Sequence, residues 1–223
     1  MRDAIAHPAT DSAAAALARE LATRLNLRRL ELPRPRAAAS PDAALAVAPV
    51  GLELYRAPRI PLVVLTPVAA ASSPLAGSSV VCGVQDDADA ACVAIAGALA
   101  TTLDLPLVLV HVEPMDDHGD ARETVARVTR AAGLDHPEGV AVRLLRGAPG
   151  RTLAATARRE GATLVVVSES VRRLPKRALF VSATGYLVRR CERPVLVCPR
   201  DPAAAMRLRD ALAPAGDVQP WRS

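Results

Sequence analysis

The chain has 223 residues, which suits one large or two small domains, and 51% of them are hydrophobic, enough for a sizeable core. Aromatic residues make up only 2%, so the core has to consist of Ala, Val and Leu, and few side chains remain to stack on bases. The net charge of +5 comes from arginines that form no long basic run. This argues against a nucleic-acid-binding protein and favours solvated arginines on helix faces.

The first third of the chain predicts a small α/β unit. Its helix is expected at residues 11–25, and its strands at residues 2–6, 27–32, 43–48 and 62–65. The strand at 2–6 is the weakest of these because it is polar. A unit this small buries too little surface to be stable alone, so we expect it to lean on the rest of the chain.

Residues 68–79 are rich in Ala, Ser, Pro and Gly and predict a linker. Beyond it, five strands are expected at 80–84, 106–112, 140–145, 162–167 and 194–198, the third of them an alternating edge strand. Four helices are expected between them, at 89–103, 121–132, 151–160 and 178–191, and Ser182 or Thr184 would cap the last if it begins late. Crossover connections of this length make the strands parallel.

Two pairs of segments resemble each other across the chain. Residues 21–27 match 99–105, and residues 56–67 match 190–199 with a small change of length. We interpret this as an internal repeat whose first copy lacks the middle helix–strand–helix portion. The predicted organisation is a truncated first half (1–67), a linker (68–79), a complete domain (80–200) and a C-terminal helix and tail (201–223).

The four cysteines form no C-x-x-C pair. Buried, reduced thiols are the simplest interpretation, and they predict a cytoplasmic protein. Cys191, among Arg189, Arg190 and Arg193, is the one candidate for a redox-sensing thiol. No apolar run is long enough to span a bilayer.

Residues 161–199 carry the most specific pattern. A β-branched run is followed by a basic loop, a helical stretch and a strand between two prolines. The segment resembles the C-terminal part of a universal stress protein (UspA-type) domain. The resemblance covers residues 79–200 and, in degraded form, the first half. It implies an open α/β fold that is Rossmann-like (adenine nucleotide alpha hydrolase-like), with five parallel strands in the order 3-2-1-4-5, in a tandem pair with a shrunken first member.

The family resemblance also points to a phosphate loop. In members that bind ATP, the strand is followed by Gly, two residues, Gly, nine residues, and then Gly-Ser or Gly-Thr; the glycines let the backbone approach phosphates. The matching positions here are Ser168, Val171, Val181 and Ser182. Only the hydroxyl position is kept, which predicts that ATP is not bound strongly.

Other positions of the predicted site each have a structural alternative. Gln85, followed by Asp86, stands where the family has a nucleotide-contacting Asp, and a helix-capping turn is the alternative. Val112 matches a family position near the adenine and is equally explained as core. Arg172 and Arg173 lie in the basic loop, where they could hold an anion or belong to a solvated surface.

No catalytic or metal-binding motif is present in the sequence. Ser168 and Cys191 have no general base that the sequence places beside them, so we predict that the chain is not an enzyme. His118 lies in an acidic loop without companions at ligand spacing, and no metal site is predicted. No cofactor is expected, and ATP is the one ligand for which the family resemblance leaves room.

The predicted function is therefore a non-enzymatic stress-response or regulatory interaction module. The alternative is a nucleotide- or phosphate-ligand-binding protein that uses the loop at 171–177. Because the family commonly dimerises through its last strand, the resemblance implies protein or self partners at Val195, Leu196 and Val197. The equivalent strand of the first half, Leu62, Val63, Val64 and Leu65, could pair with it within one chain. No nucleic acid or membrane partner is expected.

Overall fold

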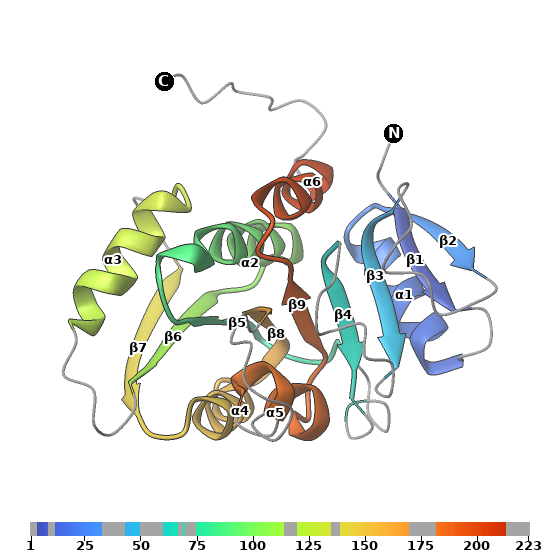
Figure 1. The fold of residues 1–223 in the computed structure, drawn as a ribbon. Coiled ribbons are helices and arrows are strands. Elements are labelled where there is room, and N and C mark those ends of the chain that lie inside the picture. The colour runs from blue at the N-terminus through green and yellow to red at the C-terminus, as the bar shows by residue number, and fades with distance from the viewer. Residues whose placement is uncertain are drawn as a thin grey trace.

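A computed structural model describes residues 4–8, 12–32, 43–49, 60–66, 69, 75–113, 120–134, 139–169 and 182–212. The strands are β1 (Ala4–Pro8), β2 (Arg28–Leu32), β3 (Ala43–Pro49), β4 (Leu62–Leu65), β5 (Ser79–Val84), β6 (Leu107–Glu113), β7 (Val140–Arg146), β8 (Ala162–Ser168) and β9 (Val195–Cys198). The helices are α1 (Ser12–Arg24), α2 (Ala90–Leu103), α3 (Ala121–Ala131), α4 (Pro149–Arg159), α5 (Ala183–Arg190) and α6 (Pro202–Leu212), with a 3-10 turn, η4 (Asp87–Asp89), before α2 (Figure 1).

One sheet of nine described strands runs through the molecule in the order β2-β1-β3-β4-β9-β8-β5-β6-β7. Neighbouring strands are parallel, except that β4 and β9 run antiparallel. In that pair, Leu62 lies opposite Val197, Val63 opposite Leu196, and Val64 opposite Val195. The α/β class predicted from the sequence is confirmed.

The sheet is larger than the five-stranded sheet that was predicted. The strands from β5 to β9 do stand in the order 3-2-1-4-5, but they do not form a five-stranded sheet of their own. The edge of β9 is occupied by β4, and the sheet continues into β3, β1 and β2. An unpaired apolar strand edge is a site of association, and here a strand of the same chain covers it.

Two layers of helices cover the sheet. One apolar cluster contains buried residues of α1, α2, α3 and α6, so these helices share a face. The other contains residues of α4 and α5, which cover the opposite face. Figure 1 shows α2 and α6 on one side of the central strands and α4 and α5 on the other. The carboxyl ends of the parallel strands β5, β8 and β9 therefore meet at one edge, between the two layers.

Local sequence explains where the elements begin and end. All four residues of β9 are buried, as in a strand covered on both faces, whereas burial along the edge strand β7 alternates. Asp120 caps α3 by accepting a hydrogen bond from the Glu123 amide at 3.0 Å, and Gly133, with φ +74°, follows its end. The first strand, expected at residues 2–6, begins at Ala4 and extends to Pro8.

The helix α6 joins the two parts of the sheet. It packs against α2 and also contacts β3, and its Leu208 and Leu212 are buried in the same cluster as residues of both. The sequence analysis expected a short helix here but did not place it in the core. In the described ranges, no helix is both long enough and apolar enough to cross a membrane.

Candidate functional site

The turn after β5 is organised around the buried carboxylate of Asp89, which is 2% exposed. Its Oδ2 accepts hydrogen bonds from the amides of Gln85 at 2.6 Å and Asp86 at 3.2 Å. Asp86 in turn accepts from the Ala88 amide at 3.0 Å, which completes a reciprocal capping box. Gln85 and Asp86 thus belong to the helix-capping turn that the sequence analysis gave as the alternative to ligand binding.

Arg200 connects this turn to the ends of β8 and β9. Its guanidinium lies 3.8 Å from Asp86 Oδ2, its Nε donates to the Glu169 carbonyl at 3.3 Å, and its amide donates to Glu169 Oε1 at 3.1 Å. The Glu169 amide donates to the Cys198 carbonyl at 2.8 Å. A closed polar network therefore crosses the carboxyl ends of β5, β8 and β9.

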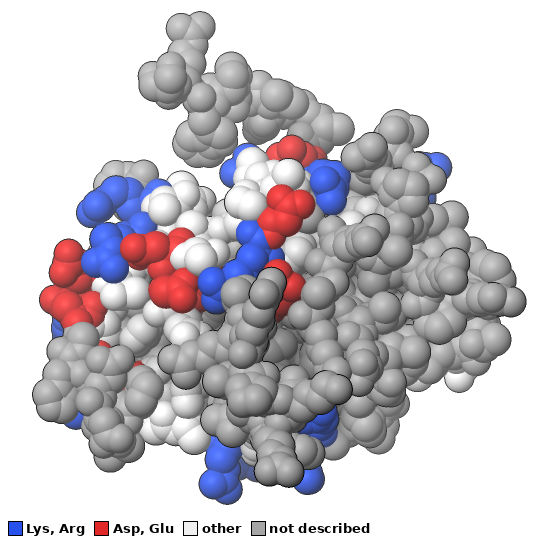
Figure 2. Space-filling model, in the orientation of Figure 1, with Lys and Arg blue, Asp and Glu red and all other residues white. Residues whose placement is uncertain are grey.

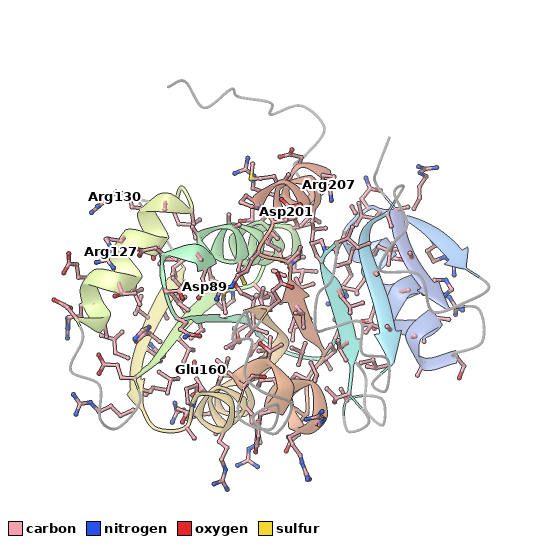
Figure 3. All side chains as sticks on the ribbon, in the orientation of Figure 1. Asp89, Arg127, Arg130, Glu160, Asp201 and Arg207 are labelled. Atoms are coloured by element: carbon pink, nitrogen blue, oxygen red, sulfur yellow. The ribbon has the colours of Figure 1, made fainter. Side chains whose placement is uncertain are left out.

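The other carboxylate of the turn is also occupied. Asp87 lies 3.2 Å from Arg127 of α3, an exposed ion pair. Figure 3 labels Asp89, in the turn, beneath α2 and Arg127 on α3. On the face drawn in Figure 2, basic and acidic side chains of the described residues are interspersed rather than gathered by sign. The carboxylates of this turn are thus engaged within the protein.

The predicted phosphate loop is described only at its two ends. Ser168 closes β8, and its carbonyl accepts a hydrogen bond from Thr184 Oγ1 at 3.0 Å. Ser182 is the N-cap of α5, where its Oγ accepts from the Gly185 amide at 3.0 Å. The helix thus has the late start that the sequence analysis considered. The remaining predicted positions, Val171, Arg172, Arg173 and Val181, lie outside the described residues, as does His118.

Val112 and its neighbour His111 lie at the end of β6. Both are half-buried; Val112 packs against the cluster on the α4 and α5 face, which fits the core interpretation. The Nδ1 of His111 is 3.0 Å from the Val84 carbonyl, so the ring is hydrogen-bonded to the neighbouring strand.

Three carboxylates of the described residues, those of Asp86, Asp89 and Glu169, lie at this edge of the sheet. Asp86 Oδ2 is 3.8 Å from the guanidinium of Arg200, whereas Glu169 Oε1 accepts from the main-chain amide of Arg200 and Asp89 Oδ2 accepts from the turn amides. Burial raises the pKa of Asp89, an effect that the Ser168 hydroxyl and the turn amides reduce. Its Oδ1 accepts no hydrogen bond from the described residues. Such a surface is poorly matched to a phosphate chain.

Metal-binding groups and surface grooves elsewhere in the described residues were also considered as sites. Among the described residues, no group of three or more His, Cys, Asp or Glu is placed to hold a metal ion. A groove of about 780 Å³ lies between α3 and β7 and is lined by Val125, Leu134, Val142 and Leu144 among others. None of the site residues predicted from the sequence lines it.

The thiol of Cys191, the predicted redox candidate, is 1% exposed and burial raises its pKa, so that prediction is wrong.

Sequence reasoning missed Asp89, Glu169 and Arg200 as parts of one site. Each directly follows or lies near the end of a predicted parallel strand. Because parallel strand ends meet at one edge of the sheet, this placement was the signal that could have brought them together. The burial of Asp89 has no such signal, since Asp86, Asp87 and Asp89 look alike in the sequence.

Comparison with known proteins gives one family. The model of the universal stress protein family matches residues 37–199. A universal stress protein from Archaeoglobus fulgidus DSM 4304 is 13% identical, with a TM-score of 0.63 over 90% of this chain and 97% of that one. A putative universal stress protein from Pseudomonas aeruginosa UCBPP-PA14 is 16% identical, with a TM-score of 0.55 over 93% and 85% of the two chains. At these identities the likeness concerns the fold. No curated protein matches the sequence.

Proposed function

The chain belongs to the universal stress protein family, and from this premise we propose that it is a non-enzymatic regulatory interaction module of tandem form. In this proposal, β1 to β4 are a shrunken first copy whose role is to cover the last strand of the complete second copy. The family relationship supplies the functional class, because fold alone does not specify function.

The antiparallel pairing of β4 with β9 is the observation that carries this proposal. Numbered within each half, the sheet reads 2-1-4-5 from β2 to β4 and then 5-4-1-2-3 from β9 to β7. The two halves thus meet through equivalent last strands, and the first half has no described counterpart of β7. The helices α1 and α2, which follow the equivalent strands β1 and β5, also pack on the same face. A repeat with a lost middle portion accounts for all three features.

Two features of the site support the proposal that ATP is not bound strongly. A residue with a neutral side chain, Gln85, stands where the family has an aspartate, and its main-chain N–H donates to Asp89 Oδ2. The guanidinium of Arg200 already pairs with the Asp86 carboxylate and donates to the Glu169 carbonyl, so this cation is not free to neutralise a phosphate. A triphosphate placed here would meet uncompensated negative charge without the glycines that let backbone amides approach it.

A nucleotide- or phosphate-ligand-binding protein is the second candidate. It is favoured by Ser182, whose hydroxyl remains at the N-terminus of α5, where helix amides favour anions. In this alternative, Arg172 and Arg173 replace the glycine cradle with side-chain charges. Binding would then depend strongly on salt.

Thermal unfolding of the full chain, with and without Mg-ATP, ADP, AMP and cyclic AMP, distinguishes the two proposals. We expect no shift of Tm with any of them at millimolar concentration, since a ligand that binds only the folded state would raise it. A stabilisation that weakens as salt is added would contradict the interaction-module proposal. The variant R172A/R173A would then locate the ligand: it should remove the stabilisation if these arginines hold the phosphate.

A further inference from the structure

The sheet of described strands ends at β7, which lies beside α3 (Figure 1). This strand carries two exposed large hydrophobic side chains, Val142 and Leu144, which are 45% and 36% exposed. They are two residues apart, so they lie on the same face of the strand. Large apolar side chains exposed next to each other indicate a surface that binds another molecule.

The main chain of β7 is unpaired on the side away from β6. The Gly139 carbonyl and the Gly147 amide both bond to β6, each at 3.0 Å. Because main-chain groups of successive strand residues point to alternate sides, Val142 and Leu144 present their N–H and C=O groups to the free edge. The Val142 carbonyl accepts a hydrogen bond of 3.3 Å from the guanidinium of Arg143, which the amide of an added strand could replace. Such an edge is a template for a further strand.

A groove lies along each face of this edge. The groove of about 780 Å³ between α3 and β7 contains Val142 and Leu144, and a second groove, of about 370 Å³, lies between β7 and α4. Six arginines line them: Arg122, Arg130 and Arg143 the first, and Arg146, Arg151 and Arg159 the second. Among the described residues, no Asp or Glu lines either groove. The side chains of an added strand would alternate between the two grooves.

Two of these arginines are paired within the protein. Arg143 lies 3.0 Å from Glu160, and Arg146 lies 3.5 Å from Glu113. The other four are exposed and form no ion pair with the described residues: Arg122 and Arg130 on α3, and Arg151 and Arg159 on α4. Their charge favours an acidic ligand. A second copy of this chain is a poor occupant, because pairing β7 with β7 would bring these arginines together.

We propose that the free edge of β7 binds an extended acidic segment of a partner protein as a further strand. In this segment, apolar residues alternate with Asp or Glu. Its apolar side chains pack on Val142 and Leu144 in the groove beside α3, and its carboxylates point into the groove that Arg151 and Arg159 line. Main-chain hydrogen bonds to β7 supply affinity, and the two unlike grooves supply specificity.

This inference deepens the proposed function, because it gives the interaction module a surface and a class of partner. It rests on that function only for its biological role, since β7 lies at the opposite side of β5 from the β4–β9 pair. Stabilisation by a nucleotide would contradict the proposed function and leave binding at β7 untouched. Failure to bind the acidic segment would contradict only the inference about β7, so the two failures are distinguishable.

The probe is a fluorescein-labelled peptide of sequence GSVEVEVESG, titrated with the full chain and followed by fluorescence anisotropy. We expect saturable binding that weakens as salt is added. A lysine version, GSVKVKVKSG, should bind at least about tenfold more weakly. A peptide of the same composition, GSVVVEEESG, should also bind at least about tenfold more weakly, because its side chains no longer match the two grooves. No binding of the first peptide, or equal binding of all three, would overturn the proposal.

Amide hydrogen exchange, followed by NMR, locates the bound peptide. Binding should slow exchange at Val142 and Leu144, whose N–H groups face the free edge. It should change exchange at Arg143 and Leu145 much less, because their amides point to β6. A peptide that binds without protecting Val142 and Leu144 does not add to β7, and the proposal would then be wrong.

Variants of the strand separate the main-chain contribution from the apolar one. V142P removes an N–H at the free edge, a place where a strand tolerates proline, and should weaken binding at least about tenfold more than V142A, which keeps that N–H. V142S/L144S keeps both N–H groups, changes only exposed side chains, and should weaken binding at least about tenfold. This second variant decides the question where thermal unfolding shows that V142P is not folded. Unchanged binding in V142S/L144S would contradict the proposal.

Charge reversal tests the choice of an acidic partner. R122E/R130E should weaken binding of the first peptide at least about tenfold. R19E/R158E is the matched control, because it changes the net charge equally at exposed helix positions outside both grooves, and it should bind within about twofold of the unmodified chain. Equal effects of the two variants would assign the binding to net charge alone. A dimer in light scattering that V142P dissociates would assign the edge to a second copy, and either result would overturn the proposal.

Discussion

The most informative single residue is Asp89, because it is a buried carboxylate with one satisfied and one unsatisfied oxygen. Burial raises its pKa in the folded state. The stability that it contributes is therefore fully present below its unfolded pKa and is lost as the pH rises through the folded value. Replacing Asp89 with Asn keeps an oxygen for the two amides and removes this ionisation.

We therefore expect D89N to gain stability relative to the unmodified chain as the pH rises from about 4 to about 8. Denaturant unfolding across this range measures the difference in unfolding free energy between the two proteins. D87N is the matched control: Asp87 is exposed and its ion pair with Arg127 is at the surface, so its difference should change little. A D89N difference that is flat with pH would show that Asp89 is not a strained carboxylate.

For single residues, the sequence predicts the role of a side chain better than its surroundings in the fold. A helix-capping turn was the predicted alternative for Gln85 and Asp86, and Asp86 and Asp89 form a capping box there. Residue type alone does not distinguish exposed Asp87 from buried Asp89, since burial depends on how α2 packs against β8 and β5. The burial of Cys82, Cys92 and Cys198 in one apolar cluster likewise depends on how helices pack on the sheet, which no local pattern records.

Among the elements, α6 is the one whose importance the sequence understated. It was predicted as a short Ala-rich helix beyond the complete domain, yet Leu208 is fully buried against the core. We expect L208A to lower the free energy of unfolding by about 2–5 kcal/mol, measured by denaturant titration. D210A, an exposed position of the same helix, should change it by less than about 0.5 kcal/mol. Equal effects of the two variants would mean that α6 does not belong to the core.

Elements with strong local signals were predicted closely, and those set by distant contacts were not. The apolar runs of β5, β6, β8 and β9 identify buried strands without help from the rest of the chain. The end of β1 was predicted two residues early because its sequence, Ala4 to Pro8, has little β-branched character. Its position is fixed instead by pairing with β2 and β3 on either side.

For the whole molecule, one strand pair decides between a closed monomer and an associating chain. β9 is the strand through which the family resemblance implied self-association, and β4 lies along it. Because the edge of β9 is occupied, we expect the full chain to be a monomer over a wide range of concentration, measured by light scattering. A stable dimer would show that another surface associates.

The pairing itself can be tested by cross-linking, since opposite residues of antiparallel strands have Cβ atoms about 4.5–5.5 Å apart. L62C/V197C places two cysteines opposite each other on the face away from Cys82, Cys92 and Cys198. We expect a disulfide within one chain under mild oxidation. L62C/L196C is the matched control, because Leu196 points to the other face and should not link to position 62. A link between two chains in L62C/V197C would mean that β9 exchanges partners, and the first half would then be a competitor for self-association rather than a permanent cover.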